Sequence, residues 1–497
     1  MDYIIGVDIG TSGTKAVAFD GTGNVIAEHR IGYPLLNPQP GYFEQEPETL
    51  FSAVIQSISH VVRAIDGMYA TCTLLGIGFS SAMHGLLVMD KDNRPLTNCM
   101  TWADTRSDAF ASHLRNTAQG LELYSKTGTP IHPMSPLPKL GWLREHLPAV
   151  FSVAHKFISI KEYVFFRLFG RYVVDESIAS ATGLFDIRAF EWHLPALDLV
   201  GVSPTQLSEP VPITYILSGL DSRFAEAMHV RADTPFIIGG SDGCLANLGA
   251  YAVVPGDAVV TIGTSGAIRI LSDRPQTDRK ARTFSYVLTD KLFVLGGAVN
   301  SGGVVLRWYL ENFGTPGIAE DEAYGLLAEE ASTVPAGAEG LVFLPYLAGE
   351  RAPHWNAGAK GMFFGVQMHH RKPHFTRAVF EGIVYGIYSV GKVLEEIAGP
   401  IHIIHANGGF ARSPLWVQLL ADVFGKEVQV TENVEGAAKG AYVVALKALD
   451  SIAEFDDIAG WGRIKRVYTP NAQNRGIYLD NFGLFERLYD KVKDEFQ

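Results

Sequence analysis

The pentapeptide Ile-Gly-Thr-Ser-Gly occurs twice in this chain, at residues 9–13 and again at residues 262–266. Each copy stands between two apolar runs of strand length, and a turn of glycine and small hydroxyl residues is typical of a hairpin. We therefore expect a strand, a polar turn and a second strand at both places. Because the flanking runs match as well as the five letters, the pattern favours an internal duplication with one hairpin in each half.

Both turns have a composition that suits an anion. Successive backbone N–H groups in a glycine-rich turn, together with threonine and serine hydroxyls, can surround a phosphate. An ordinary hairpin turn is the alternative for either copy taken alone. If each half forms one lobe, the two hairpins would face each other across a cleft and hold a polyphosphate from both sides.

The composition narrows the class of protein. A length of 497 residues with 47% hydrophobic and 19% charged residues predicts a large core and more than one domain. The formal net charge is −12 and no long basic block occurs, which disfavours a nucleic-acid partner. The three cysteines are far apart, which argues against a structural zinc site or a disulfide scaffold. No apolar run reaches membrane-spanning length, so we expect a cytoplasmic protein without a membrane partner.

Hydrophobic spacing predicts alternating strands and helices in both halves. The first half is expected to hold strands at 3–7, 16–19, 25–33 and 74–79, and a helix at 48–65. The second half is expected to hold strands at 291–295, 341–345, 401–406 and 427–431, and helices at 302–312, 377–397, 414–424 and 484–496. This order predicts an α/β fold of two ribonuclease-H-like lobes, 1–243 and 244–497, around a central cleft.

Two aspartates stand where phosphoryl transfer would need them. Asp8 ends the first strand, beside the first turn, and could face a Mg²⁺ ion through water; a turn-capping role is its alternative. Asp242 follows an apolar strand that ends in glycines, where ligands bind to open α/β sheets, and could accept a proton from a hydroxyl. An Asx turn is the alternative for Asp242. No GxxxxGK[ST] motif occurs, which disfavours a P-loop fold.

Other polar clusters are weaker signals. His84 could hydrogen-bond a polyol, although a single histidine is more often structural, and residues 101–106 could add an aromatic platform. The glycines at 408–409 would let a nucleoside approach the backbone, unless they form a plain strand–helix turn. The histidines at 369, 370 and 374 resemble metal ligands, but the proline, the adjacent cations and the absence of nearby acids favour a solvated loop.

Two longer motifs, MSPLPKLGWLREH at 134–146 and GMFFGVQMHHRKPHFTRAVFE at 361–381, resemble the signatures of the FGGY carbohydrate kinases. This family has the actin, Hsp70 and hexokinase fold, and the resemblance covers almost the whole chain. It implies ATP- and Mg²⁺-dependent phosphorylation of a sugar, a polyol or a sugar acid. A non-enzymatic actin-like or chaperone-like ATPase, or a silent sugar sensor, is the alternative from another class. Intact Asp8 and Asp242 disfavour the sensor.

The resemblance also implies site residues. Asp242 matches the catalytic base and Asp8 the aspartate near the metal. The phosphate loops and nucleotide contacts fall on Thr11, Ser12, Thr14, Lys15, Gly263, Thr264, Ser265, Gly303, Arg307, Gly409 and Ser413. The substrate side, which Asp242 also contacts, falls on Met83, His84, Trp102 and Asp104.

Several segments are most similar to the gluconate-phosphorylating branch of the family, among them TWADTRSD at 101–108 and VVDESIASATGL at 173–184. D-gluconate, converted to 6-phosphogluconate, is therefore the expected substrate, and xylulose or another family substrate is the alternative. Ala103 disfavours xylulose, because the xylulose branch usually has asparagine there. The gluconate carboxylate needs a cation, for which Arg106, Lys161 and His132 are candidates, with surface charge as their alternative role. A homodimer is possible.

Overall fold

The computed structural model describes residues 1–315, 317–431 and 436–496. Its chain forms two compact units. The first comprises residues 1–253, 272–294 and 435–459, and the second comprises residues 254–271, 295–434 and 460–497. The first unit thus includes a segment from near the end of the chain. The single boundary expected between residues 243 and 244 stays a prediction.

The first unit is an α/β unit built on a six-stranded sheet with the order β13-β14-β5-β1-β2-β3. Its strands are β1 (Asp2–Ile9), β2 (Gly13–Asp20), β3 (Val25–Gly32), β4 (Glu44–Gln45), β5 (Thr73–Ser81), β6 (Leu87–Met89), β7 (Cys99–Met100), β8 (Lys156–Ile158), β9 (Val173–Asp175), β10 (Phe185–Asp186), β11 (Glu191–Trp192), β12 (Glu209–Val211), β13 (Ile216–Leu217), β14 (Phe236–Ser241) and β17 (Phe284–Val287). Its helices are α1 (Pro47–Met68), α2 (Asp108–Arg115), α3 (Ala118–Thr127), α4 (Pro136–His146), α5 (Pro148–Val153), α6 (Ile160–Phe169), α7 (Glu176–Ser180), α8 (Leu194–Val200), α9 (Ser222–Met228), α10 (Asp242–Gly249) and α15 (Gly436–Ala448).

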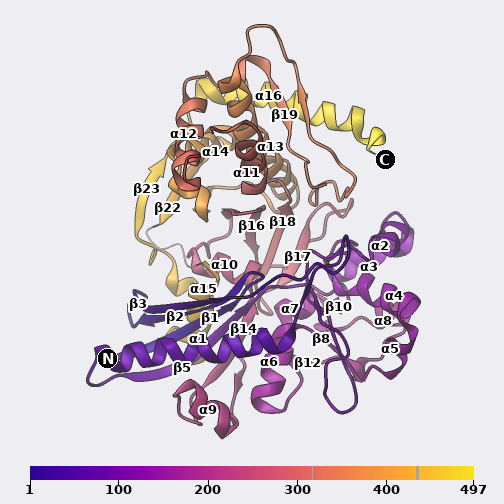
Figure 1. The fold of residues 1–497 in the computed structure, drawn as a ribbon, viewed down its shortest axis with the longest axis vertical. Coiled ribbons are helices and arrows are strands. Elements are labelled where there is room, and N and C mark those ends of the chain that lie inside the picture. The colour runs from indigo at the N-terminus through magenta and orange to yellow at the C-terminus, as the bar shows by residue number, and fades with distance from the viewer. Residues whose placement is uncertain (316, 432–435, 497) are drawn as a thin grey trace. The chain divides into compact units, whose positions relative to one another are not determined.

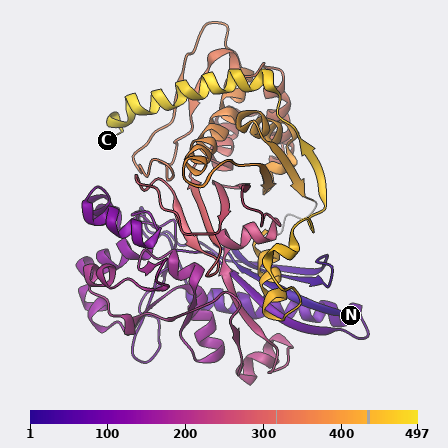
Figure 2. The ribbon, with the colours of Figure 1, turned by 180° about the vertical axis from the view of Figure 1, so that it is seen from behind.

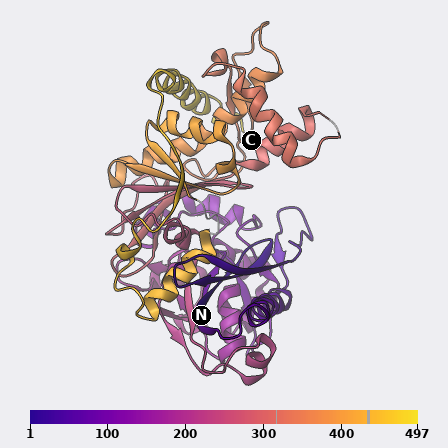
Figure 3. The ribbon, with the colours of Figure 1, turned by 90° about the vertical axis from the view of Figure 1, so that its left-hand side faces the viewer.

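Two helices from distant parts of the chain cover this sheet. Helix α1 begins where the Glu46 carboxylate caps the amide of Thr49, and its apolar residues at three- and four-residue spacing pack against β2 and β3 (Figure 1). Helix α15 packs against β1, β5 and β14 and against α10 (Figure 3). Strands β1 and β5 therefore lie in the core, which explains their nearly continuous apolar sequence.

The second unit holds a sheet with the order β18-β16-β15-β21-β22-β23. Its strands are β15 (Asp257–Ile262), β16 (Gly266–Ser272), β18 (Phe293–Val299), β19 (Val342–Leu344), β20 (Met362–Phe364), β21 (Ile403–Asn407), β22 (Glu427–Thr431) and β23 (Ile464–Tyr468). Its helices are α11 (Gly303–Phe313), α12 (Glu320–Ser332), α13 (Lys372–Ala398), α14 (Pro414–Phe424) and α16 (Ala472–Val492). Helix α13 packs against α11, α12 and α14, and α14 packs against α16.

Most predicted elements are confirmed within a few residues, including both hairpins that contain the repeated pentapeptide. The prediction for the terminal helix was wrong about its start. Helix α16 begins at Ala472, behind an Asn471 cap, and not at residue 484. Figure 2 shows it as the long yellow helix that leads to the C-terminus. Its first two turns carry few apolar residues, so hydrophobic spacing gave no signal for them.

Candidate active site

Three parallel strands of the first unit end at one edge of its sheet. In register, Asp8 of β1 lies opposite Ser80 of β5, and Ser80 lies opposite Gly240 of β14. The Ser80 hydroxyl donates a 2.9 Å hydrogen bond to Oδ1 of Asp8. Asp242 follows two residues after Gly240. Only β5 separates β1 from β14, so these two strands run about 10 Å apart.

Asp242 is the first residue of α10, a helix that begins directly at the end of β14. The backbone N–H of Gly243 donates to Oδ1 of Asp242 at 2.7 Å, and Ser241 caps the helix by accepting from the amide of Cys244. Asp242 is partly exposed, whereas Gly243 and Cys244 are buried. The N-terminus of a helix favours a negative charge, so this position suits an ionised carboxylate.

The first pentapeptide turn is held through its carbonyl groups. Gly10 N–H donates to the Gly13 carbonyl at 3.1 Å and closes the turn. The Tyr33 hydroxyl donates to the Gly10 carbonyl at 2.6 Å, and the Gln45 amide donates to the Thr11 carbonyl at 2.8 Å. Protein donors therefore hold two carbonyl oxygens that would repel a phosphate.

Side chains of the same loop have different surroundings. Ser12 Oγ accepts from Arg30 at 2.7 Å. Thr14 is fully buried, and its hydroxyl lies 3.3 Å from that of Tyr33. Lys15 forms a 2.9 Å ion pair with Glu28 on the neighbouring strand. Thr14 thus supports the hairpin from within, while Ser12 and Lys15 lie nearer the surface.

The segments with the expected substrate residues converge on a buried lysine. Lys139 Nζ donates to the carbonyls of His84, Thr101 and Met134, each at 2.7 Å. Burial lowers the pKa of Lys139 to about 7. These bonds use all three ammonium protons and tie the loop after β5 to the loop that carries Trp102.

His84 is buried and has a left-handed backbone, with φ of 68°. Its Nδ1 lies 2.8 Å from the Ala181 carbonyl, and its Nε2 lies 3.4 Å from the Tyr286 hydroxyl. Met83, beside it, is partly exposed. Trp102 Nε1 donates to Thr11 Oγ1 at 2.8 Å and so links the expected substrate side to the first phosphate loop.

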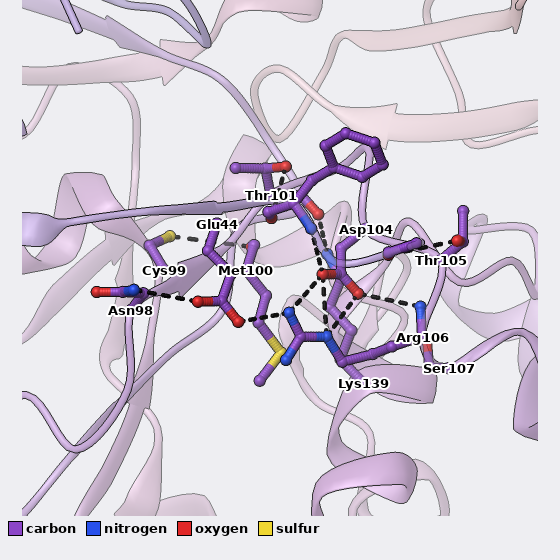
Figure 4. A network of polar contacts seen from close by, with 12 residues as sticks. Glu44, Asn98, Cys99, Met100, Thr101, Asp104, Thr105, Arg106, Ser107 and Lys139 are labelled. Atoms are coloured by element: carbon purple, nitrogen blue, oxygen red, sulfur yellow. Dashed lines mark hydrogen bonds and ion pairs between the residues drawn. The ribbon is translucent and has the colours of Figure 1, made fainter. Parts of the chain in front are cut away.

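Asp104 is fully buried inside an ionic network (Figure 4). Its carboxylate accepts from the Phe43 amide at 2.8 Å and from the Arg106 guanidinium at 2.7 and 2.9 Å. Arg106 also donates to Glu44 at 2.6 Å and stacks on the Tyr42 ring, 3.8 Å from its centroid. The network explains how Asp104 holds its loop, and its contact with substrate stays a prediction.

The three candidates for a substrate carboxylate all contact protein groups. Arg106 pairs with Asp104 and Glu44, as described, and Lys161 forms a buried 2.7 Å ion pair with Asp175. His132 accepts from the Met134 amide through Nδ1 at 3.2 Å, which leaves Nε2 as the protonated nitrogen of a neutral ring. The charges of Arg106 and Lys161 are thus neutralised by protein carboxylates.

The second unit contains a cavity of about 780 Å³. It is lined by six of the residues expected to bind nucleotide, namely Gly263, Thr264, Gly303, Arg307, Gly409 and Ser413. Phe380, Phe410 and Trp416 add an apolar wall. The cavity size and the aromatic wall suit a nucleoside.

Helix α11 begins against the second pentapeptide turn. The Gly263 amide donates to the Ser265 carbonyl at 2.9 Å and closes the turn. The amides of Gly303 and Val304, in the first turn of α11, donate to the carbonyls of Gly263 and Thr264 at 2.7 and 3.0 Å. The carbonyls are again held by protein donors, here from a helix N-terminus.

Sequence reasoning missed several supporting residues. Tyr33 and Gln45 lie in segments without a motif, and only the fold shows that they reach the first turn. Lys139 was part of a quoted signature, and a lysine within the otherwise apolar run at 136–143 was the available signal. The histidines at 369, 370 and 374 were interpreted as a solvated loop, which was wrong for His370, because it is buried. Glu339, which pairs with His369 and His374, is the nearby acid that the local sequence lacks.

Residues 1–315, 317–431 and 436–496 contain neither a cluster of metal ligands nor a membrane-spanning helix. No group of three or more histidine, cysteine or acidic residues in these ranges could hold a metal ion. Within the same ranges, no helix has both the length and the apolar character that crossing a membrane requires.

Comparison with known proteins defines the class. Residues 3–249 match the N-terminal domain of the FGGY family of carbohydrate kinases, and residues 258–449 match its C-terminal domain. The chain belongs to this family, and its two-domain α/β fold is confirmed. It is therefore a kinase that transfers a phosphoryl group to an alcohol.

Particular relatives share almost the whole chain. It is 45% identical to the gluconokinase of Bacillus subtilis (strain 168), over 99% of this chain and 97% of the relative, and 30% identical to that strain's xylulose kinase, over 99% and 98%. Gluconate kinase from Lactobacillus acidophilus has a similar solved structure, with a TM-score of 0.94 and 34% identity over 99% of this chain and 98% of that one. A ligand-bound xylulose kinase from the same organism gives the same TM-score and identity, over 100% and 99%.

Proposed function

We propose that this kinase uses ATP to phosphorylate the 6-hydroxyl of D-gluconate in the cytoplasm, yielding 6-phosphogluconate and ADP. The identity to curated relatives carries the choice of substrate, because it is 45% for a gluconokinase and 30% for a xylulose kinase over comparable lengths. The two Lactobacillus structures do not separate the substrates, since both match equally. Xylulose is the second candidate for that reason.

Asp242 is the proposed general base. Its carboxylate accepts the proton of the 6-hydroxyl while that oxygen attacks the γ-phosphorus of ATP. The bond from the γ-phosphorus to the bridging oxygen breaks, and ADP leaves with that oxygen. The position of Asp242 supports this role, because it lies at the carboxyl edge of the sheet and is partly exposed.

The two pentapeptide turns are the proposed phosphate loops. In the first unit the loop residues are Thr11, Ser12, Thr14 and Lys15, and in the second they are Gly263, Thr264 and Ser265. Gly303, Arg307, Gly409 and Ser413 are proposed to hold the nucleoside, which their place in the 780 Å³ cavity supports. Met83, His84, Trp102 and Asp104 are proposed for the acceptor side.

The family implies Mg²⁺, and the residues present fit that ion. Mg²⁺ keeps most of its waters and binds one or two carboxylates together with substrate phosphates, so a protein cage of ligands is not expected. Asp8, at the end of β1 beside the first turn, is the carboxylate that would hold it. When bound, Mg²⁺ would neutralise charge on the phosphates.

A substrate panel tests the proposal. Purified kinase with Mg·ATP is assayed for ADP release with D-gluconate, xylulose, ribulose, glycerol and water alone. We expect kcat/KM for D-gluconate to exceed that for every other acceptor at least tenfold. Preference for xylulose would select the second candidate, and ADP release that does not depend on an acceptor would contradict the proposal.

A further inference from the structure

Strand β14 contains a bulge just before Asp242. Ile237 pairs with Gly78 of β5, but the next pair joins Gly240 to Ser80, so Ile238 and Gly239 together oppose Phe79. Gly239 has φ of 63°, and a Cβ there would lie 1.7 Å from the Phe79 carbonyl oxygen. A bulge bends its strand and redirects the residues that follow. The direction in which β14 presents Asp242 therefore depends on this backbone.

Side chains from neighbouring elements hold both polar atoms of the peptide group that joins Gly240 to Ser241, just after the bulge. Lys161 of α6 donates from Nζ to the Gly240 carbonyl at 3.0 Å. Ser177 of α7 accepts from the Ser241 amide at 2.7 Å through Oγ. Both contacts are buried, and Gly240 and Ser241 are the two residues directly before the proposed base.

Asp175 joins these two contacts into one unit. Its Oδ2 pairs with Lys161 Nζ at 2.7 Å, and its Oδ1 accepts from the Ser177 hydroxyl at 2.5 Å. Oδ1 also accepts from the Ile178 amide at 3.0 Å, which caps α7. The exposed fraction is 2% for the Lys161 side chain and 1% for that of Asp175. A buried charged pair is tolerated when it has good geometry and further hydrogen bonds of this kind.

We propose that Lys161, Asp175 and Ser177 form a positioning unit for Asp242, fixing the backbone that aims its carboxylate at the acceptor hydroxyl. This inference rests on the proposed role of Asp242 as general base. A base must lie within hydrogen-bond reach of the proton it accepts, and a displacement of 1 Å can lower the rate roughly 100-fold. Lys161 then serves to orient the base, and not to bind the carboxylate of gluconate as its sequence context suggested.

Ser177→Ala is the primary test, because it removes the acceptor for the Ser241 amide and leaves the ion pair of Lys161 and Asp175 in place. We expect kcat with D-gluconate to fall about tenfold while KM for ATP changes less than twofold. Ser57→Ala is the matched control, since Ser57 is equally buried and donates to the Val54 carbonyl in α1. Thermal unfolding shows whether both variants fold alike.

The ion pair is tested by the double variant Lys161→Met/Asp175→Asn, since removing one partner alone would leave a buried unpaired charge. We again expect a lower kcat and an unchanged KM for ATP. Lys439→Met is the control, because Lys439 is also buried in the first unit and donates to a carbonyl, that of Gly23, in a hairpin turn remote from β14.

A mutant cycle separates positioning from a general structural role. Ser177→Ala and Asp242→Asn are measured singly and together, at high enzyme concentration. If Ser177 acts through Asp242, adding Ser177→Ala to Asp242→Asn lowers kcat no further. If the two substitutions lower kcat additively, or if Ser177→Ala keeps the wild-type kcat, the positioning unit is wrong, but the assignment of Asp242 as the base still stands. A near wild-type kcat in Asp242→Asn would instead overturn the base assignment, and the positioning unit with it.

Discussion

The indole nitrogen of Trp102 donates a 2.8 Å hydrogen bond to the hydroxyl of Thr11. The bond joins the loop that follows β7 to the first pentapeptide turn, two segments far apart in sequence. Gln45 adds a second bond to the same turn, at the Thr11 carbonyl. The proposed phosphate loop and the proposed acceptor side of the first unit are therefore held as one structure.

Trp102→Phe keeps the aromatic face and removes this donor. A hydrogen bond of this kind contributes about 1 kcal/mol, so we expect kcat/KM to fall roughly fivefold with either substrate varied. Steady-state kinetics at fixed Mg²⁺ measure the change. Trp192→Phe is the control, because Trp192 donates to the Ser208 carbonyl at 3.1 Å and lies outside the proposed site. A change in KM for gluconate alone would contradict the idea that this bond couples the phosphate loop to the acceptor side.

Asp242→Asn removes the proposed base without changing the size of the side chain. General base catalysis contributes about 10²–10⁴-fold, so we expect kcat to fall by that range while the affinity for ATP stays within a factor of two. Single-turnover assays and calorimetric titration with a non-hydrolysable ATP analogue provide the two measurements. Asp233→Asn, at an exposed position, should keep wild-type kinetics.

The pentapeptide shows how far the sequence could predict the fold. The repeated sequence predicted both hairpins, but the two hairpins differ in strand register. Ile9 pairs with Thr14, whereas Ile262 pairs with Gly266. The surroundings differ: side-chain donors hold the first turn, and the amides at the start of α11 hold the second. Contacts from distant segments therefore select the register, and local sequence does not contain them.

Prediction of the site from the sequence was limited in the same way, by contacts between distant segments. The aspartates and glycines were predictable because turn chemistry and strand ends are local signals. The partners of Arg106 and Lys161 were not, because Glu44 and Asp175 meet them only in the folded chain. Both cations carry a charge that suits a substrate carboxylate, and only the structure shows that protein carboxylates already neutralise it.

Gly303→Ala tests the nucleotide cavity. A Cβ at this position would lie 2.7 Å from the Gly263 carbonyl oxygen, so α11 must move away from the second turn. We expect KM for ATP to rise about tenfold, or roughly 1.4 kcal/mol, with little change in KM for gluconate. Gly476→Ala is the control, because a Cβ in that part of α16 meets nothing within 4 Å. An unchanged KM for ATP would argue against nucleotide at this place.

The pH dependence of stability provides the last prediction. Burial, then the charges of Asp175 and Asp290, raise the pKa of Glu176 from 4.5 to about 7. Between pH 4.5 and 7 the folded chain thus keeps a proton that the unfolded chain has lost, and stability falls as the pH rises through this window. Above pH 7 the half-buried carboxylate is ionised in the folded chain, and the full cost of its burial lowers the stability of the fold.

Glu176→Gln removes this cost. We expect the variant to be more stable than the wild type by roughly 1 kcal/mol at pH 8, a value reduced for the partial exposure of the group, and equal to it near pH 4.5. Denaturant unfolding from about pH 4 to about pH 8 gives the two curves. Glu226→Gln, at an exposed position of α9, should leave the curve unchanged. Parallel curves for Glu176→Gln and the wild type would show that Glu176 keeps an ordinary pKa in the folded chain.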